Sequence, residues 1–359
     1  MNNRQKNIAY SLILLSLVGL VYLYRLYHPP TPGAAAASGP RALRHLKGIT
    51  MGVVAYNVKY LDAENRDFQA EIDTLLKNFN RSLSTYDPTS EISRFNQGTS
   101  AFVFESAFFY PVVARSQEIY ELTAGAFDPT VAPLVNAWGF GFKKQVLPSP
   151  AQVDSLKKLI GYDKITFDQK QIRKNQPGVM LDFSAIAKGY GVDCVAKLLE
   201  SKGIQDYMVE IGGEVVTKGV NEEGKHWLLG ITHPRYKQPG QPPLFKTVML
   251  QNRAMATSGN YENYYIKDGK KYVHTIDPAT GYPVEHSLKS ASVFAPDCMT
   301  ADALATAFMV LGVEKTKAVL KKIKAVDVFL IYEDEQGNLQ SFASPGIAAQ
   351  IKEVPRNPS

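Results

Sequence analysis

The predicted fold centres on the segment Leu181-Asp-Phe-Ser-Ala-Ile-Ala-Lys-Gly-Tyr-Gly-Val-Asp193. We expect a strand to end here and a long amphipathic helix to run over residues 185–202, with Gly203 as its stop. Exposed amides at a helix start attract phosphate, and Lys188 adds a positive charge in the first turn. Asp182 is also an ordinary acidic residue for a helix N-terminus. The segment is not a Walker sequence, so by itself it is a weak indication of a phosphate site.

Strand and helix patterns alternate irregularly on both sides of this helix. Further helices are expected over residues 68–79, 107–122, 153–159 and 300–311, the last capped by Thr300 and closed by Gly312. Strands are expected over residues 50–58, 207–211, 226–231, 246–250, 272–276 and 326–332. Because there is no regular strand–helix–strand repeat, the sequence predicts an α+β fold with a single mixed α/β catalytic domain.

The N-terminal region predicts a membrane anchor. Residues Ile8 to Tyr24 are almost wholly apolar and follow Arg4 and Lys6. A run of about 17 residues is at the short end of what crosses a bilayer, and the preceding cations place the N-terminus in the cytoplasm. A cleaved signal peptide is the alternative, but the small residues at Ala34–Ala37 come late for a cleavage site.

These features predict four parts in the chain. Residues 1–28 form an anchor or signal segment, 29–47 a Pro/Ala/Gly linker, 48–350 the catalytic domain and 351–359 a C-terminal tail. The expected location is the cell inner membrane, with the catalytic domain on the extracytoplasmic, periplasmic side.

Composition narrows the classes of partner. The chain has 359 residues, 45% of them hydrophobic, and a net charge of +6. The six basic residues up to Lys47 account for this excess, since the remaining 34 basic residues balance 34 acidic ones. A near-neutral folded body argues against nucleic-acid binding. The only cysteines are Cys194 and Cys298, best interpreted as small buried residues, although a disulfide between them stays open.

Several other segments contain more Gly, Asp, Thr and aromatic residues than folding alone explains. Ser84–Asn96 offers Tyr86 as a ring-stacking platform, although it also fits a turn and a capped helix start. Gly125–Gly141 is expected to be an irregular loop around a flat ligand, with Asp128 accepting a hydrogen bond. The glycines of Glu210–Glu214 and Ala256–Tyr261 would allow a ligand to approach the backbone closely.

Two segments carry the most specific chemistry. His274–Pro283 places a histidine and an aspartate beside a tight turn, although a lone histidine is more often structural. In Thr300–Ala307, Asp302 and Thr306 stand four residues apart and share one helix face. Carboxylate and hydroxyl oxygens suit a hard cation such as Mg²⁺, although a capping acid and a buried threonine would explain the pair equally well.

Together the ordered motifs resemble the ApbE-type FAD:protein FMN transferases. The motifs are Gly-Ala-Phe-Asp-Pro-Thr, Ala-Ile-Ala-Lys-Gly, Ala-Thr-Ser-Gly, His-x-Ile-Asp-Pro-x-Thr-Gly and Ala-Asp-Ala-x-Ala-Thr, and the likeness covers residues 50–312. The resemblance implies that Asp302, Thr306 and the carbonyl of Ala185 bind Mg²⁺. The implied FAD contacts are Met51, Tyr86, Ala126, Phe127, Asp128, Asp182, Lys188 and Ile276.

The implied reaction transfers FMN from FAD to a Thr or Ser hydroxyl of a client redox protein and releases AMP. His274 is the expected base and Asp277 its rival, while Lys188 adds a second positive charge at the phosphates. An FAD pyrophosphatase and a non-catalytic extracytoplasmic flavin-binding protein are the alternatives. Tyr86 favours transfer over hydrolysis, and the presence of both Asp302 and Thr306 argues against simple storage.

Overall fold

The computed structural model describes residues 41–141, 147–261 and 263–354, and the chain divides into two units, residues 1–41 and 42–359. The predicted anchor at Ile8–Tyr24 lies outside the described residues, as does the Pro-rich part of the linker, residues 29–40. Among the residues that are described, no helix is long and apolar enough to cross a membrane. All the described helices and strands belong to the second unit.

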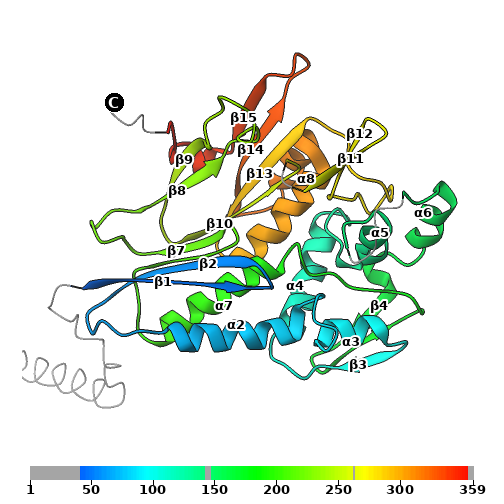
Figure 1. The fold of residues 1–359 in the computed structure, drawn as a ribbon, viewed down its shortest axis with the longest axis horizontal. Helices are drawn as coiled ribbons and strands as arrows, with labels where there is room; N and C mark the ends of the chain where they lie inside the picture. Colours follow the sequence, from blue (N-terminus) through cyan, green and yellow to red (C-terminus); the bar gives the residue numbers. More distant parts are fainter. Residues whose placement is uncertain (1–40, 142–146, 262, 355–359) are drawn as a thin grey trace, which may run out of the picture. The chain divides into compact units, whose positions relative to one another are not determined.

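An eight-stranded sheet forms the centre of this unit (Figure 1). Each neighbouring pair is antiparallel, in the order β1-β2-β6-β7-β10-β13-β14-β15. The strands are β1 (Ala42–Thr50), β2 (Val54–Asp62), β6 (Tyr207–Ile211), β7 (Glu214–Lys218), β10 (Arg253–Gly259), β13 (Leu288–Ala295), β14 (Asp327–Glu333) and β15 (Leu339–Ala343). An antiparallel sheet combined with separate helices confirms the predicted mixed α/β class.

Both faces of the sheet are covered, as the two-residue period of its strands shows. Ala254 and Val293 belong to the core shared with the helices, whereas their neighbours Met255 and Phe294 belong to a second core on the other face. Figure 1 shows helices below the sheet and a small sheet above it. The covering elements are α7 (Ala187–Ser201), α8 (Cys298–Leu320), β8 (Trp227–Thr232), β9 (Leu244–Leu250) and β16 (Ile351–Lys352).

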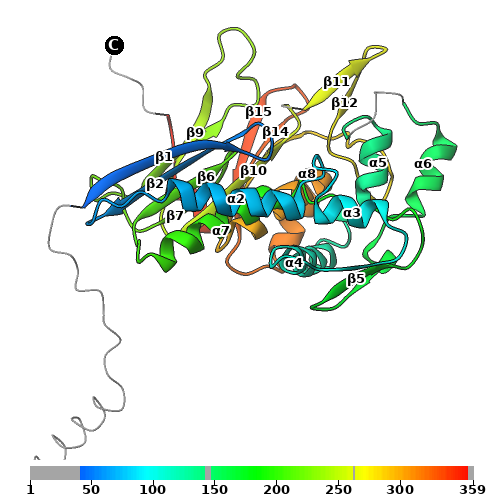
Figure 2. The same cartoon turned by 60° about the horizontal axis from the view of Figure 1, so that its bottom comes forward.

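Most of the remaining elements lie around the helical layer (Figure 2), whereas α9 packs on β14 and its Ile347 belongs to the second core. Helix α2 packs against α7, and α4 packs against α8. At the end of α5, the Trp138 indole N–H donates to the Gly281 carbonyl at 2.8 Å and so joins α5 to the turn before Tyr282. The bounds are α2 (Gln69–Leu83), α3 (Glu91–Gln97), β3 (Ala101–Val103), α4 (Phe109–Leu122), η1 (Pro129–Val131), α5 (Ala132–Ala137), α6 (Pro150–Lys157), η2 (Tyr162–Lys164), β4 (Ile165–Phe167), β5 (Gln171–Lys174), β11 (Tyr264–Lys267), β12 (Lys270–Val273) and α9 (Pro345–Ala348).

Three local predictions differ from the structure. The folded unit starts at Ala42 rather than at residue 48, because β1 pairs along its whole length with β2. No strand leads directly into α7; instead the Asp182 amide donates to the Pro129 carbonyl of a neighbouring loop, 2.8 Å. The segment expected to be irregular contains η1 and α5, because Pro129 and Pro133 stand at helix starts, where a missing N–H costs nothing.

Helix α8 also begins and ends differently from the prediction. Its N-cap is Asp297, whose carboxylate accepts the Thr300 amide at 2.8 Å, so Thr300 lies inside the helix and does not cap it. Gly312 does interrupt the helix, with φ 72°, but helical turns resume after it and reach Leu320. His286 donates from Nε2 to the Met309 carbonyl at 2.7 Å, just before this break.

Candidate functional site

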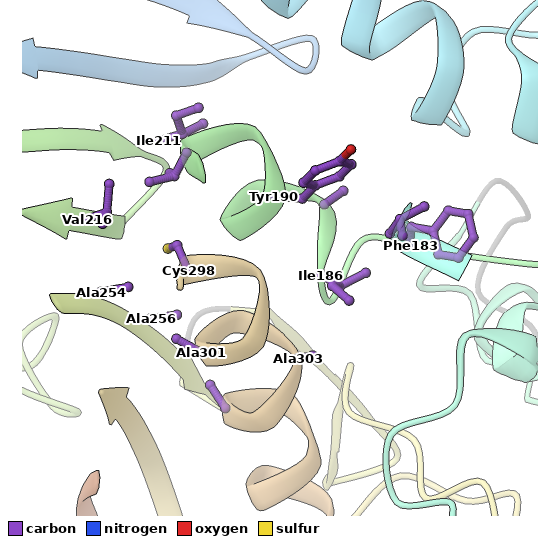
Figure 3. Close-up of a cluster of buried hydrophobic side chains, with 14 of the residues drawn as sticks. Phe183, Ile186, Tyr190, Ile211, Val216, Ala254, Ala256, Cys298, Ala301 and Ala303 are labelled. Carbon is purple, nitrogen blue, oxygen red and sulfur yellow. The ribbon is translucent and has the colours of Figure 1, made fainter. Parts of the chain in front are cut away.

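The centre of the candidate site is the crossing of α7 and α8. A Cβ atom on Gly189 would lie 2.2 Å from the Cys298 carbonyl oxygen, so the two backbones meet at a position that only glycine allows. The Gly189 amide donates to Asp302 Oδ2 at 2.9 Å. Figure 3 shows the surrounding core, with Tyr190 on α7 and Cys298 on α8. The predicted phosphate-binding helix start and the predicted metal-ligand helix are therefore in direct contact.

A second residue of α7 ties the same crossing together. Asp193 is buried, and its two carboxylate oxygens accept the amides of Cys298 and Met299 at 2.9 and 2.8 Å. Burial raises the pKa of Asp193 to about 7. Cys194 and Cys298 are both free thiols; Cys298 is buried as predicted, and Cys194 is half-buried. The α7–α8 contact is thus fixed by hydrogen bonds rather than by a disulfide.

Two buried acids, Asp302 and Glu214, flank the half-buried Lys188 and form a charged cluster at this crossing. Lys188 Nζ lies 2.5 Å from Glu214 Oε1 and 3.8 Å from Asp302 Oδ1. Burial raises the pKa of Asp302, and it raises that of Glu214 to about 7. Burial alone would lower the pKa of Lys188, but the Asp302 and Glu214 carboxylates outweigh it and raise that pKa. Two acids sharing one ammonium leave the cluster short of positive charge.

The other two predicted metal ligands lie on α8 and just before α7. Thr306 lies one helical turn further along α8, and its hydroxyl is 3.1 Å from the Ser258 hydroxyl on β10. Ala185 lies in the turn just before α7. In the part of the chain that the structure describes, no three His, Cys, Asp or Glu side chains gather into a metal site. A cation here would therefore depend on one carboxylate, a hydroxyl and a carbonyl, a donor set that suits Mg²⁺.

His274 follows β12, and its ring is held in a defined orientation. Its Nδ1 lies 3.0 Å from the Asn263 carbonyl oxygen, and its own amide donates to the same oxygen at 3.1 Å. Because a carbonyl can only accept, Nδ1 carries the proton and Nε2 is left as the acceptor. Phe140 packs edge-on against the ring, with centroids 6.4 Å apart. Burial lowers the pKa of His274, which keeps the imidazole neutral at pH 7.

The turn after His274 engages the other two residues predicted there. Asp277 Oδ1 accepts the Ala279 amide at 2.9 Å, so this carboxylate stabilises its own turn. The strand predicted to reach Ile276 ends at Val273, and Ile276 instead makes an isolated bridge with Pro283. The Ile276 side chain is buried in the small core that contains Trp138. Only the Ile276 backbone is left to contact a ligand.

The side chains of the predicted flavin-binding segments, around Asp128 and Asp182, already make contacts within the protein. Asp128 Oδ1 accepts both the amide and the hydroxyl of Thr130, at 2.8 and 2.6 Å, and burial raises its pKa to about 6. The Phe127 ring is part of the main core, and Ala126 is buried beside it. Asp182 accepts the amide and hydroxyl of its neighbour Ser184. Contacts from Ala126 and Phe127 to FAD would therefore come from the backbone.

Met51 and Tyr86 lie on two different connections, the β1–β2 turn and the segment before α3. Met51 lies in the turn between β1 and β2 with φ 47°, and its Cε would be 3.2 Å from a Cβ on Gly191 of α7. The Met51 side chain therefore lies against the helix that carries Lys188. Tyr86 precedes α3 and is 75% exposed.

Three polar partners in the site had been given no role from the sequence. Glu214, Ser258 and Asn263 contact Lys188, Thr306 and His274 respectively. Glu214 and Ser258 stand inside motifs that were noted for their glycines. For Glu214 the usable signal was an acidic residue directly after two glycines, at the head of an apolar strand. Asn263 acts through its carbonyl, so no side-chain pattern could have identified it.

Comparison with known proteins identifies the family to which the chain belongs. The model of the ApbE family matches residues 49–330, which include every predicted site residue. The chain belongs to the ApbE family. An FAD:protein FMN transferase of Haemophilus influenzae is 43% identical over 305 residues, covering 81% of this chain and 87% of the relative. One from Vibrio cholerae is 40% identical over 310 residues, covering 84% and 91%.

Solved ApbE structures share the fold. The flavin transferase ApbE from Vibrio cholerae superposes with a TM-score of 0.77 at 39% identity, covering 85% of this chain and 98% of the other. The flavinyl transferase ApbE from Pseudomonas stutzeri, in its apo form, gives 0.76 at 31% identity, covering 86% and 96%. The α7–α8 crossing, β10 and the turn after β12 all lie within the region that matches the ApbE family.

Proposed function

We propose that this member of the ApbE family is a Mg²⁺-dependent FAD:protein FMN transferase that modifies a Thr or Ser hydroxyl of client redox proteins. The observation that carries the proposal is the α7–α8 crossing, where Asp302 lies between the Gly189 amide and the Lys188 ammonium. The names of the relatives give the class of reaction. Mg²⁺ as the metal is an inference from the proposed donor set, whereas the acceptor hydroxyl and AMP as the leaving group are what the resemblance to the family implies.

The charged cluster suits a bound cation. Asp302 is 2% exposed, and one Glu214 oxygen is buried with no hydrogen-bond partner among the described residues. Such groups are costly unless a positive charge or a donor satisfies them. Asp302, Thr306 and the Ala185 carbonyl would hold Mg²⁺, which would supply charge neutralisation at the FAD pyrophosphate. Lys188 would bind a phosphate oxygen directly, since its side chain is 31% exposed.

The transfer needs little covalent chemistry from the protein. The client hydroxyl oxygen forms a bond to the phosphorus on the FMN side, the bond from that phosphorus to the bridging oxygen breaks, and AMP leaves. Enzymes accelerate such reactions mainly by alignment and charge stabilisation. The hydroxyl proton goes to Nε2 of His274, which the Asn263 carbonyl keeps unprotonated. Asp277 is the weaker candidate, because its carboxylate already accepts the Ala279 amide.

We also propose that the reaction takes place outside the cytoplasm at the inner membrane. The support is the apolar run Ile8–Tyr24 with basic residues in front of it. Mature protein recovered in the membrane fraction with Met1 or Asn2 at its N-terminus is the expected result. A soluble protein starting beyond Ala34 would show cleavage of a signal peptide instead.

One assay tests the activity. The full-length chain in detergent is incubated with FAD, Mg²⁺ and a candidate client redox subunit, and the client is analysed by in-gel flavin fluorescence and mass spectrometry. We expect a mass increase of one FMN on a Thr or Ser, together with stoichiometric AMP. FMN and AMP released without client labelling would indicate the pyrophosphatase. Bound FAD that stays intact would indicate a flavin-holding protein.

A further inference from the structure

Glu214 is a buried acid that the proposed reaction does not use. It is the first residue of β7, follows the Gly212–Gly213 turn, and is 2% exposed. Oε1 pairs with Lys188, but Oε2 is buried and finds no hydrogen-bond partner among the described residues. A half-satisfied buried carboxylate costs stability, so its position beside Lys188 calls for a compensating role.

The geometry of Lys188 indicates what that role is. Its ammonium lies 2.5 Å from Glu214 Oε1 but 3.8 Å from Asp302 Oδ1, which is beyond hydrogen-bond distance. The other oxygen of Asp302, Oδ2, is occupied by the Gly189 amide at 2.9 Å. We therefore take Oδ1 as the Asp302 oxygen that a cation would bind, and the Lys188 ammonium as its competitor for that oxygen.

We propose that Glu214 is a positioning residue that holds the Lys188 ammonium away from Asp302 and so keeps Asp302 open to a divalent cation. The inference deepens the proposed function and rests on its metal site. Lysine has a flexible four-carbon stem, and the Lys188 side chain is 31% exposed, so it has room to move. Without the Glu214 charge, Lys188 pairs with Asp302 and neutralises the only formal charge among the proposed ligands.

The charge of the cluster gives this idea a second consequence. When both carboxylates are ionised, Glu214, Asp302 and Lys188 together carry a net charge of −1, which repels the pyrophosphate of FAD until a cation binds. Removing the Glu214 charge brings the cluster to zero. Glu214 therefore favours cation binding and disfavours FAD binding without metal. A residue that only supports the fold would not move the two affinities in opposite directions.

The test compares Glu214→Gln with wild type in the full-length chain. Isothermal titration of the FAD-free protein with Mg²⁺ should show affinity reduced about tenfold or more, within the usual range for coupled binding sites. Titration with FAD in excess EDTA should show tighter binding. Glu214→Asp, which keeps the charge on a shorter side chain, should lie between the two proteins. Equal Mg²⁺ affinity in Glu214→Gln and wild type would overturn the proposal.

A matched control and a second-site variant separate positioning from other roles. Glu210 lies on the same hairpin, but its oxygens accept the Gly213 amide and the Asn57 side chain, so Glu210→Gln should leave Mg²⁺ binding unchanged. Adding Lys188→Met to Glu214→Gln removes the competing ammonium and should restore Mg²⁺ affinity. If the double variant stays weak, Glu214 contacts the metal shell itself and the positioning role is wrong.

The outcomes also separate this inference from the proposed function. If wild type binds Mg²⁺ no better than Glu214→Gln but still labels its client, the proposed function is supported and the role proposed for Glu214 is wrong. The expected affinity changes in a protein that labels no client support the role of Glu214 and count against the transferase. A wild type that binds no Mg²⁺ at all refutes the positioning role directly.

Discussion

Gly189→Ala offers the sharpest test of how α7 and α8 build the site. The added Cβ would lie 2.2 Å from the Cys298 carbonyl oxygen and 2.8 Å from Asp302 Cβ, whereas ordinary contacts begin at 3.4 Å. Both obstacles are fixed, one on the α8 backbone and one at the root of a side chain. The helices must therefore separate by about 1 Å, which also stretches the bond from the Gly189 amide to Asp302.

The expected loss of stability is the sum of one stabilising and two destabilising effects. Alanine in a helix interior is about 1 kcal/mol better than glycine. Overpacking a tight contact costs about 1–3 kcal/mol, and weakening the hydrogen bond to a buried carboxylate costs about 1–3 kcal/mol more. The net expectation is a loss of about 3 kcal/mol, or about 4–5 °C in melting temperature for a domain of this size. Mg²⁺ affinity should fall as well, because Asp302 moves.

Gly191→Ala is the matched control on the same helix. Its added Cβ would meet Met51 Cε at 3.2 Å and Ile211 Cδ1 at 3.4 Å, both at the ends of flexible side chains. We expect stability within about 1 kcal/mol of wild type and unchanged Mg²⁺ binding. Thermal melts and Mg²⁺ titrations of both variants decide the matter. A Gly189→Ala protein as stable as Gly191→Ala, with wild-type Mg²⁺ affinity, would refute the proposed close contact.

Three further predictions concern the metal, the base and pH. Asp302→Ala should abolish Mg²⁺ binding and FMN transfer with the fold retained by circular dichroism; full activity in excess chelator would contradict it. His274→Ala should bind FAD normally but transfer about 10²–10⁴-fold more slowly, with a smaller loss at high pH; weak FAD binding and a pH-independent loss would make it structural. The pKa of Asp193 is raised to about 7, so between about pH 4 and 7 the folded chain holds a proton that the unfolded chain releases. Stability should therefore fall as the pH rises through this range. Asp193→Asn should lessen that fall in thermal melts, and an unchanged slope would argue against this role of Asp193.

Local features of the sequence predicted a large part of the fold. The periodicity that predicted α2, α4 and α7, and the strand β6, needs only neighbouring residues to be recognised. The predictions are wrong where a contact with a residue far away in the sequence determines the local structure. β1 contains basic residues that suited a linker, and only its pairing with β2 makes it a strand. Helix α5 was concealed by prolines, which end helices in their middle but begin them at the first turn.

In the candidate site too, local features of the sequence could be predicted and contacts between distant residues could not. The residues that the sequence identified have distinctive chemistry of their own, such as Asp302 on a helix face or His274 beside a turn. Their partners act through position: the Gly189 amide, the Asn263 carbonyl and the Glu214 carboxylate each come from another element. A backbone atom leaves no trace in residue type, and a contact between α7 and β7 has no fixed spacing along the chain.

This division affects how the site would tolerate change. Replacing Asp302 or His274 removes a reacting or binding group, so activity is lost at once. Replacing a partner leaves the group in place but frees it to take another neighbour, as Lys188 would take Asp302 once Glu214 is neutral. Such variants should keep measurable activity with altered Mg²⁺ and FAD affinities. Affinity measurements in the absence of turnover will therefore detect the positioning residues that loss-of-activity screens of the same site overlook.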